Sequence, residues 1–291
     1  MCRLTAQRLL QCVALMFSVQ LCLSAENSRS LNVLSFNIRF DNPKDAPNDW
    51  PSRRDKVASQ ILFHEADIIG FQEPVYGQLK DLESRLKDYR YVGIGSDDGK
   101  RAGTHAAIFF DERRLQLHES ATFWLSETPE VAGSKNWDSV HARIVTWARF
   151  TDRVTKRTFY VFNTHFDHKG VEARRHSARI LLEAVSRIAA SHPSIITGDF
   201  NTVPDSEPIQ MITSPDNPMR LIDCKSISEQ GHYGPSGTFN GFKGKENSDY
   251  PIDFIFIKGP WRVLQHATLS QTWGGLFSSD HFPVFARVQL P

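Results

Sequence analysis

Short runs of hydrophobic residues recur along residues 30–291, and most have the length and composition of β-strands. These runs, rich in Val, Ile and Phe, predict strands at 31–38, 67–71, 106–110, 144–150, 159–163, 194–197, 252–257 and 284–288. No repeat, low-complexity tract or long linker interrupts the series. We therefore expect one domain that extends from residue 26 to residue 291.

Helical periodicity is clearest at 171–191, where apolar residues recur every three or four positions. These residues are Ala178, Leu181, Val185 and Ile188. A second helix is predicted to open at Ser52, because Ser52 and Asp55 have the spacing of a capping box. The middle strands follow one another without intervening helices, which disfavours a doubly wound parallel sheet. An α/β fold with two packed sheets and outer helices fits better.

The first 25 residues have the features of a signal peptide. Arg3 and Arg8 give a positive start, residues 9–23 are mostly apolar, and Ser24 and Ala25 are small residues suited to cleavage. The apolar stretch is short for a membrane span, so a retained anchor is the less favoured alternative. We expect cleavage after this segment, no membrane span in the mature chain, and a secreted or periplasmic location.

Cysteine content and charge exclude several classes of protein. Three of the four cysteines lie in residues 1–25, so the mature chain keeps only Cys224 and can form no internal disulfide. A lone cysteine is also a poor basis for a zinc–thiolate site. Cleavage removes two arginines and no acid, which leaves 32 basic and 33 acidic residues. This balance is unlike the basic footprint of a dedicated nucleic-acid-binding protein.

Polar side chains gather where five apolar segments begin or end. The five clusters are Asn37 with Arg39, Gln72 with Glu73, His165 with Asp167, Asp199 with Asn201, and Asp280 with His281. In sheet proteins ligands bind at strand ends, where a rigid backbone aims side chains into one crevice. Any single cluster is more simply read as a turn or cap, but five together indicate a functional site.

The spacing within the clusters indicates which side chains can face that site. In an extended chain, residues i and i+2 point to the same side, as in Asn37 and Arg39. Asp280 and His281 are adjacent and would point apart, so His281 needs another carboxylate to fix its tautomer. Asp253 is the best candidate, because apolar residues flank it. Together these carboxylate and amide oxygens suit Mg²⁺, Mn²⁺ or Ca²⁺ rather than a soft metal.

At these positions the chain resembles the endonuclease/exonuclease/phosphatase superfamily, whose motifs occur here in order. They are Asn37, Gln-Glu at 72–73, Thr-His at 164–165, Gly-Asp-Phe-Asn at 198–201, Ile-Asp-Phe-Ile at 252–255 and Ser-Asp-His at 279–281. The ordered set covers essentially all of residues 30–291. Residues 38–42, 122–129 and 163–168 resemble a bacterial branch related to RgfB-like proteins and, more distantly, to the CCR4/nocturnin deadenylase group.

The resemblance implies a four-layer α/β/β/α sandwich with two mixed, mainly antiparallel sheets flanked by helices. It also implies that Glu73 is the principal ligand of a divalent metal, with Asn37 and Asp280 nearby. The metal would be Mg²⁺ or Mn²⁺, and Ca²⁺ is also compatible. Arg39 and Asp167 fit substrate-facing positions by their spacing.

The resemblance further implies catalytic roles for five residues. Asp199 would position or deprotonate the attacking water, and Asn201 would hold a phosphate oxygen. His165 and His281 would stabilise the transition state, with Asp253 orienting His281. Many superfamily members support the middle histidine with an acid just before the strand at 106–110, where this chain has Gly-Thr-His. We therefore expect His165 to be oriented differently, through Asp167 or His105.

These patterns predict an exported, divalent-metal-dependent hydrolase of phosphoester bonds. A binuclear zinc hydrolase is one rival, because residues 165–168 partly resemble an H-x-H-x-D-H motif, but Asn163 occupies the place of the first histidine. A non-catalytic, phosphate-ligand-binding protein on the same fold is the other rival. The near-neutral mature charge favours a small phosphoester substrate over a long nucleic acid, and we expect a monomer.

Overall fold

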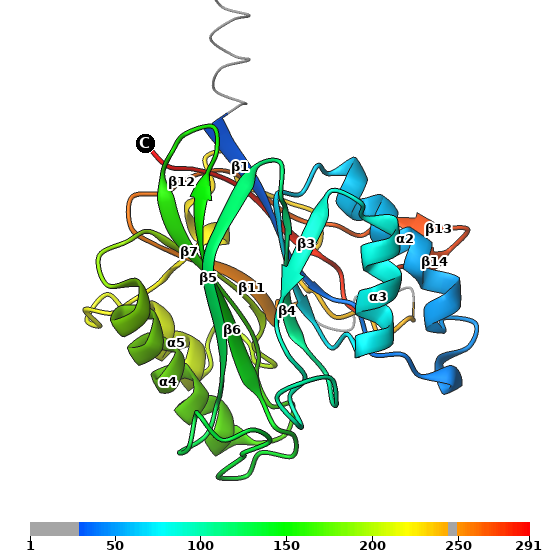
Figure 1. The fold of residues 1–291 in the computed structure, drawn as a ribbon, viewed down its shortest axis with the longest axis horizontal. Helices are drawn as coiled ribbons and strands as arrows, with labels where there is room; N and C mark the ends of the chain where they lie inside the picture. The colour runs from blue at the N-terminus through cyan, green and yellow to red at the C-terminus, as the bar shows by residue number, and fades with distance from the viewer. Residues whose placement is uncertain (1–28, 244–248) are drawn as a thin grey trace, which may run out of the picture.

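A computed structural model describes residues 29–243 and 249–291 (Figure 1). The predicted signal peptide lies outside the described residues. Within them, no helix is both long and apolar enough to cross a bilayer. Two large sheets form the centre of the molecule, and helices cover their outer faces (Figure 1). The predicted four-layer α/β/β/α sandwich is confirmed.

The first sheet has seven strands in the order β10-β12-β15-β1-β2-β4-β3. Its strands are β1 (Ser30–Asn37), β2 (Ile68–Gln72), β3 (Tyr89–Val92), β4 (Ala106–Asp111), β10 (His232–Tyr233), β12 (Arg262–Thr268) and β15 (Val284–Gln289). Neighbours pair antiparallel except for β1 with β2 and β10 with β12. The sheet is therefore mixed and mainly antiparallel, as predicted.

The second sheet has six strands in the order β5-β6-β7-β8-β11-β9, of which only β7 and β8 pair in parallel. Its strands are β5 (Leu115–Trp124), β6 (Ile144–Asp152), β7 (Thr158–His165), β8 (Ser194–Asp199), β9 (Ile222–Asp223) and β11 (Asp253–Lys258). A separate hairpin joins β13 (Thr272–Trp273) to β14 (Leu276–Phe277). The helices are α2 (Trp50–Phe63), α3 (Tyr76–Arg85), α4 (Val171–Ala189) and α5 (Glu207–Thr213), with short 3-10 turns η1 (Pro43–Asp45) and η2 (Cys224–Ile227).

Within the described residues, the three larger hydrophobic clusters hold the four layers together. The core between the sheets contains residues of both, such as Val33 and Val161. The seven-stranded sheet packs through Phe36 and its neighbours against α2 and α3. The six-stranded sheet packs through Phe162 and its neighbours against α4 and α5. Because side chains on a strand alternate between faces, each central strand contributes to one inner and one outer core.

The same alternation carries the candidate side chains to one edge of the inter-sheet space. In β1, Leu31 and Val33 lie in the core between the sheets. Asn37 lies an even number of residues further along, so it points to the same inner face. His165 ends β7 and Asp199 ends β8 on the inner face in the same way. Residues far apart in the sequence therefore meet where the strands end.

A buried polar layer separates the apolar core from that edge. Asn163 donates to the carbonyl oxygens of Phe71 and Ala107 at 2.8 and 3.0 Å. Its own oxygen accepts from Gln72 at 2.7 Å and from Thr197 at 2.9 Å. Because buried polar groups are costly unless bonded, this network fixes the register of the two sheets just below the site.

Several element boundaries differ from the sequence prediction. The helix predicted to open at Ser52 begins at Trp50, with Asp49 as N-cap and a proline in the first turn, so Ser52 lies inside the helix. The strands predicted at 159–163 and 194–197 extend to His165 and Asp199. These two residues therefore belong to the strands themselves, which fixes their direction more firmly than a loop would.

Candidate active site

A cavity of about 600 Å³ opens at the edge where the strands end. It is lined by Arg39, Phe40, Glu73, Val75, Ser96, Asp97, Gly103, Thr104, His141, Arg143, His165, His168, Asp199, Asn201, Phe239, Ile252, Asp280 and His281. All five polar clusters of the sequence lie in or next to this cavity, although Gln72 is buried in the polar layer beneath it. Its volume is in the range of small-molecule sites.

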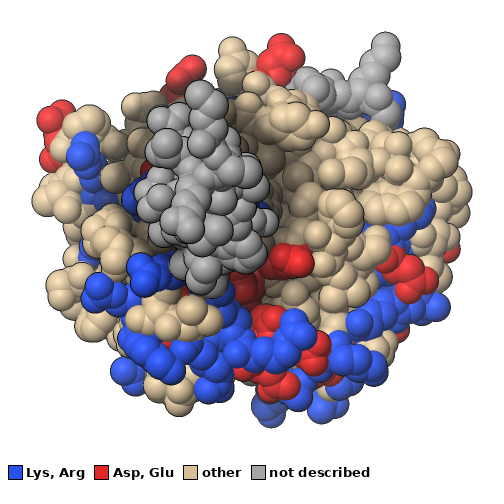
Figure 2. Space-filling view, turned by 90° about the horizontal axis from the view of Figure 1, so that it is seen from above, with Lys and Arg blue, Asp and Glu red and all other residues tan. Residues whose placement is uncertain are grey.

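A second cavity, of about 500 Å³, lies at the opposite ends of the strands, near Ser30. Figure 2 shows that end of the molecule, where basic side chains are interspersed with acidic ones. Arg113 is paired there with Asp111, and Arg114 with Asp152. None of the polar clusters reaches this cavity, and its charges are largely occupied by one another. We therefore place the candidate active site in the first cavity.

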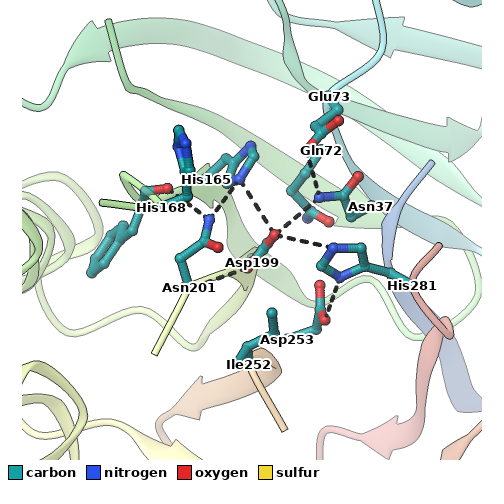
Figure 3. Close-up of polar contacts among 12 residues, drawn as sticks. Asn37, Gln72, Glu73, His165, His168, Asp199, Asn201, Ile252, Asp253 and His281 are labelled. Atoms are coloured by element: carbon teal, nitrogen blue, oxygen red, sulfur yellow. Dashed lines mark hydrogen bonds and ion pairs between the residues drawn. The ribbon is translucent and has the colours of Figure 1, made fainter. Parts of the chain in front are cut away.

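Asp199 is the centre of the site (Figure 3). Asn37 donates to its Oδ2 at 2.9 Å, and the backbone N–H of Asn201 donates to its Oδ1 at 2.9 Å. The Nε2 atoms of His165 and His281 lie 3.3 and 3.8 Å from Oδ2. Burial would raise the pKa of Asp199, but the two histidine charges and these hydrogen bonds hold it below its ordinary value. Asp199 is therefore a carboxylate at neutral pH.

Asp253 and His281 form a buried pair next to Asp199 (Figure 3). His281 Nδ1 lies 2.9 Å from Asp253 Oδ2, and Thr238 donates its hydroxyl to the same oxygen at 2.6 Å. Burial would lower the pKa of His281, but Asp253 and Asp199 hold it well above its ordinary value. Burial and the charge of Asp199 raise the pKa of Asp253. The pair thus holds a proton on the imidazole, with Nε2 directed at Asp199.

His165 is held by Asn201 and Asp199. Asn201 Nδ2 lies 2.9 Å from His165 Nε2 and also donates to the carbonyl of Phe166 at 3.0 Å. The other ring nitrogen of His165 is buried and has no hydrogen-bond partner among the described residues. His105 bonds the carbonyl of Pro74 instead. The expectation that His105 or Asp167 orients His165 is therefore wrong.

Glu73, Asn37 and Asp280 lie together on the other side of Asp199. Asn37 donates to Glu73 Oε1 at 3.2 Å, and the N–H of Phe40 donates to Oε2 at 3.1 Å. Burial, together with the charge of Glu73, raises the pKa of Asp280 despite the opposing effect of His281. Arg39 lines the cavity with its Nε 3.8 Å from Asp280 and 2.9 Å from Asp45. Two acidic side chains thus face the cavity beside one arginine.

Asp167 lies beside the cavity but does not line it. Its side chain is fully buried, and its oxygens accept from the backbone N–H groups of Val140, His141, Lys169 and Gly170. These bonds hold the pKa of Asp167 below its ordinary value in spite of burial. Strand β7 ends at His165, so the two-residue spacing that predicted a shared direction fails beyond it. Asp167 ties two loops together.

Three residues that build the site carry no strong signal in the sequence. Arg143, directly before β6, lines the cavity and is almost fully buried. Arg53 in α2 donates to the carbonyls of Ile38 and Ser278, both at 2.8 Å, and so joins the segments that carry Asn37 and Asp280. Thr238 lies in a segment without apolar periodicity. Only Arg143 could have been suspected from the sequence, because it places a charged residue directly before a predicted strand.

A scan against protein-family models matches residues 34–281 to the endonuclease/exonuclease/phosphatase family. An endonuclease/exonuclease/phosphatase structure from Bacteroides vulgatus is 37% identical, with a TM-score of 0.86 over 90% of this chain and 99% of that chain. The structure of a mannosyl-6-phosphatase from Bacteroides thetaiotaomicron is 34% identical, with a TM-score of 0.83 over 89% and 100%. Protein L388 of Acanthamoeba polyphaga mimivirus is 32% identical over 81% of this chain and 90% of its own length.

Proposed function

Because the chain belongs to the endonuclease/exonuclease/phosphatase family, we propose that it is a divalent-metal-dependent hydrolase of phosphoester bonds. The observation that carries this proposal is the position of Asp199. It is a buried carboxylate, and it lies within 3.8 Å of two imidazoles that are directed at it from opposite sides. A buried carboxylate held between two imidazoles is suited to accept a proton while negative charge develops nearby.

The donors around Glu73 fit a hard cation. Glu73 and Asp280 both line the cavity, and carboxylate oxygens are ligands that a hard divalent cation prefers. Asn37 donates to Glu73 through its Nδ2, while its oxygen accepts from the N–H of Arg39, so Asn37 positions the Glu73 carboxylate. When bound, a divalent ion would supply Lewis-acid stabilisation of phosphoryl charge. Glu73 would be its principal ligand.

A second group could also hold a cation. One ligand atom each from Asp199, Asp253 and His281 lies within 4.8 Å of the others. Two of these residues are already bonded to each other through His281 Nδ1, and Asn37 bonds the third. A cation there would have to displace these hydrogen bonds, whereas Glu73 and Asp280 have room toward the cavity. We therefore assign the metal to Glu73 and Asp280.

The remaining side chains suit in-line attack of water on a phosphoester. Asp199 accepts the proton of the attacking water. The Nε2–H of His281 donates to a phosphoryl oxygen as its charge grows. The Asn201 amide, which the sequence led us to expect on a phosphate oxygen, instead bonds His165 and the carbonyl of Phe166, so it positions His165. Arg143 is held by Asp167 and His168 through two of its nitrogens, while its Nη1 forms no hydrogen bond within the described residues. The Nη1 end of the Arg143 guanidinium therefore offers a fixed positive charge to a phosphoryl oxygen.

We propose a small phosphomonoester as substrate. The cavity is of small-molecule size, and a relative 34% identical along its whole length is a mannosyl-6-phosphatase. The charge of the mature chain is close to neutral, which gives little attraction for a long nucleic acid. We further propose that the protein is secreted or periplasmic, which rests on the signal-peptide features of residues 1–25.

The test is a panel of phosphomonoesters and phosphodiesters, each assayed with Mg²⁺, Mn²⁺, Ca²⁺ and Zn²⁺. We expect metal-dependent release of phosphate from at least one small monoester. The Asp199→Asn protein should lose about 10²- to 10⁴-fold in kcat, the usual effect of removing a catalytic base. Failure to hydrolyse any ester with any of the metals, or an unimpaired Asp199→Asn protein, would contradict the proposal.

A further inference from the structure

The cavity extends beyond the catalytic residues. Its far wall is formed mainly by two segments, residues 93–105 and 125–143, of which the proposed reaction uses only Arg143. Trp124 donates from its indole to the carbonyl of Ser96 at 2.7 Å, and Gly133 packs against the backbone of Asp97. These contacts hold the two segments of the wall against each other.

Asp97 presents a carboxylate on this wall. Ser96 donates its hydroxyl to Oδ1 at 3.0 Å, and Asp97 Oδ2 forms no hydrogen bond within the described residues. A side chain at Gly103, which has φ of +82°, would stand 2.6 Å from this carboxyl group. Position 103 thus suits glycine both for its left-handed backbone and for the space that Asp97 occupies. The carboxylate is held in place yet open to the cavity.

His168 and His141 complete the wall. Their rings stack with centroids 5.5 Å apart at 22°. Arg143 can only donate, so its contact at 3.3 Å makes His168 Nδ1 an acceptor and leaves the hydrogen of the neutral ring on Nε2. Burial and the charge of Arg143 lower the pKa of both imidazoles. The His141 ring forms no hydrogen bond with any described residue. Both rings are exposed to the cavity as neutral polar groups.

We propose that Asp97, His141 and His168 form a subsite for the hydroxyl groups of the leaving alcohol, and that the substrate is a sugar phosphate. A carboxylate accepts hydrogen bonds from neighbouring hydroxyls, and neutral imidazoles donate to or accept from them. The charge of Asp97 disfavours a second phosphate group there, which argues against a nucleic-acid backbone. The proposal rests on the proposed function and names its substrate class.

The test compares two esters that share a six-membered ring and an exocyclic phosphate. Mannose 6-phosphate carries ring hydroxyls, and cyclohexylmethyl phosphate carries none. We measure kcat/KM for both and take their ratio for the wild type and for the Asp97→Ala and His168→Ala proteins. A site built to bind hydroxyls discriminates strongly against an analogue that lacks them. We expect the wild type to prefer the sugar ester, and each variant to lower the ratio by about tenfold or more.

Glu130→Ala is the matched control. Glu130 is an exposed acid in the same wall segment, does not line the cavity and forms no hydrogen bond with the described residues. Its ratio should equal that of the wild type. Equal rates on both esters in the wild type, or variant ratios that match the control, would overturn the subsite. In either of these outcomes, a wild type that hydrolyses cyclohexylmethyl phosphate still supports the proposed function. A wild type that is inactive on both esters and on the whole panel overturns the subsite and the proposed function together.

Discussion

At the scale of single residues, the site depends on buried charges whose neighbours have the opposite sign. Asp199 stays ionised because two imidazoles and an amide face it, and His281 stays protonated because Asp253 and Asp199 flank it. Removing one member leaves an uncompensated buried charge, which is more costly than the loss of one hydrogen bond. Substitution of a residue that hydrogen-bonds one of these buried charged groups should therefore affect catalysis.

Thr238 gives the sharpest test of that reasoning. Its hydroxyl donates to Asp253 and accepts from the N–H groups of Ile252 and Asp253 at 3.0 and 3.2 Å. Thr238→Val keeps the shape but leaves these groups unsatisfied, so kcat should fall about tenfold, or roughly 1.4 kcal/mol, with little change in KM. Thr238→Ser keeps the hydroxyl and should retain most of the activity. Steady-state kinetics on both proteins decides, and an unaltered kcat in Thr238→Val would count against the role.

Residue-level prediction from the sequence succeeded where a strand continued and failed where it ended. Asp253 was matched to His281 because its apolar neighbours marked it as buried, and the two side chains are in contact. Asp167 was placed by a two-residue spacing that holds only in extended chain, and the chain turns after His165. Thr238 and Arg53 act through contacts with residues distant in sequence, which no local pattern records.

At the scale of elements, the two sheets are held in register by the polar layer beneath the site. Gly70 in β2 lies where a side chain would overlap Thr197 Oγ1 and stand 2.6 Å from Asn163 Oδ1. The close approach of the two sheets at this level requires a residue without a Cβ. Strands β7 and β8, which carry His165 and Asp199, are therefore positioned partly by a glycine on the opposite sheet.

Gly70→Ala should destabilise the protein by about 1–3 kcal/mol, the usual cost of overpacking a core. Gly77→Ala is the matched control, because a Cβ at Gly77 in helix α3 meets nothing within 4 Å. Alanine is the better helix former, so this variant should be unchanged or more stable by up to about 1 kcal/mol. Urea denaturation of both proteins measures the difference. Equal stabilities of the two variants would show that the sheets can separate here without cost.

The sequence predicted the buried strands and missed strands such as β5 and β12. Central strands such as β1 and β8 carry continuous apolar runs because both of their faces are covered. Strand β5 is an edge strand with half of its residues exposed, and β12 is interrupted by a bulge between Val263 and Gln265, so neither shows a clear period. Packing against the neighbouring strand, which the local sequence does not report, determines both elements.

At the scale of the whole molecule, stability should depend on pH through a buried histidine that does not line the active-site cavity. His266 in β12 is 5% exposed, and its Nδ1 lies 2.9 Å from Nδ1 of His232 in β10. Burial, together with the charges of His232 and Lys225, lowers the pKa of His266 from 6.5 to about 3. The unfolded chain therefore binds a proton more readily than the folded protein between these two values.

That difference has a definite sign. Folding stability contributed by neutral His266 is fully present above pH 6.5 and is lost as the pH falls toward 3. Between pH 7 and pH 5 the loss should be about 2 kcal/mol. His266→Asn cannot titrate there, so its stability should fall less over the same interval. Chemical denaturation at both pH values tests this, and parallel losses in the two proteins would exclude His266 as the cause.

The central claim is that separate stretches of the chain form one metal-dependent phosphoesterase site. The most direct measurement is phosphate release from a small monoester by wild type and Glu73→Gln proteins as Mg²⁺ is titrated after chelation. We predict that chelation abolishes wild-type activity and that Mg²⁺ restores it. Glu73→Gln should need about 10- to 100-fold more Mg²⁺ or fail to recover. Activity that survives chelation, or an identical Mg²⁺ dependence in the two proteins, would contradict the claim.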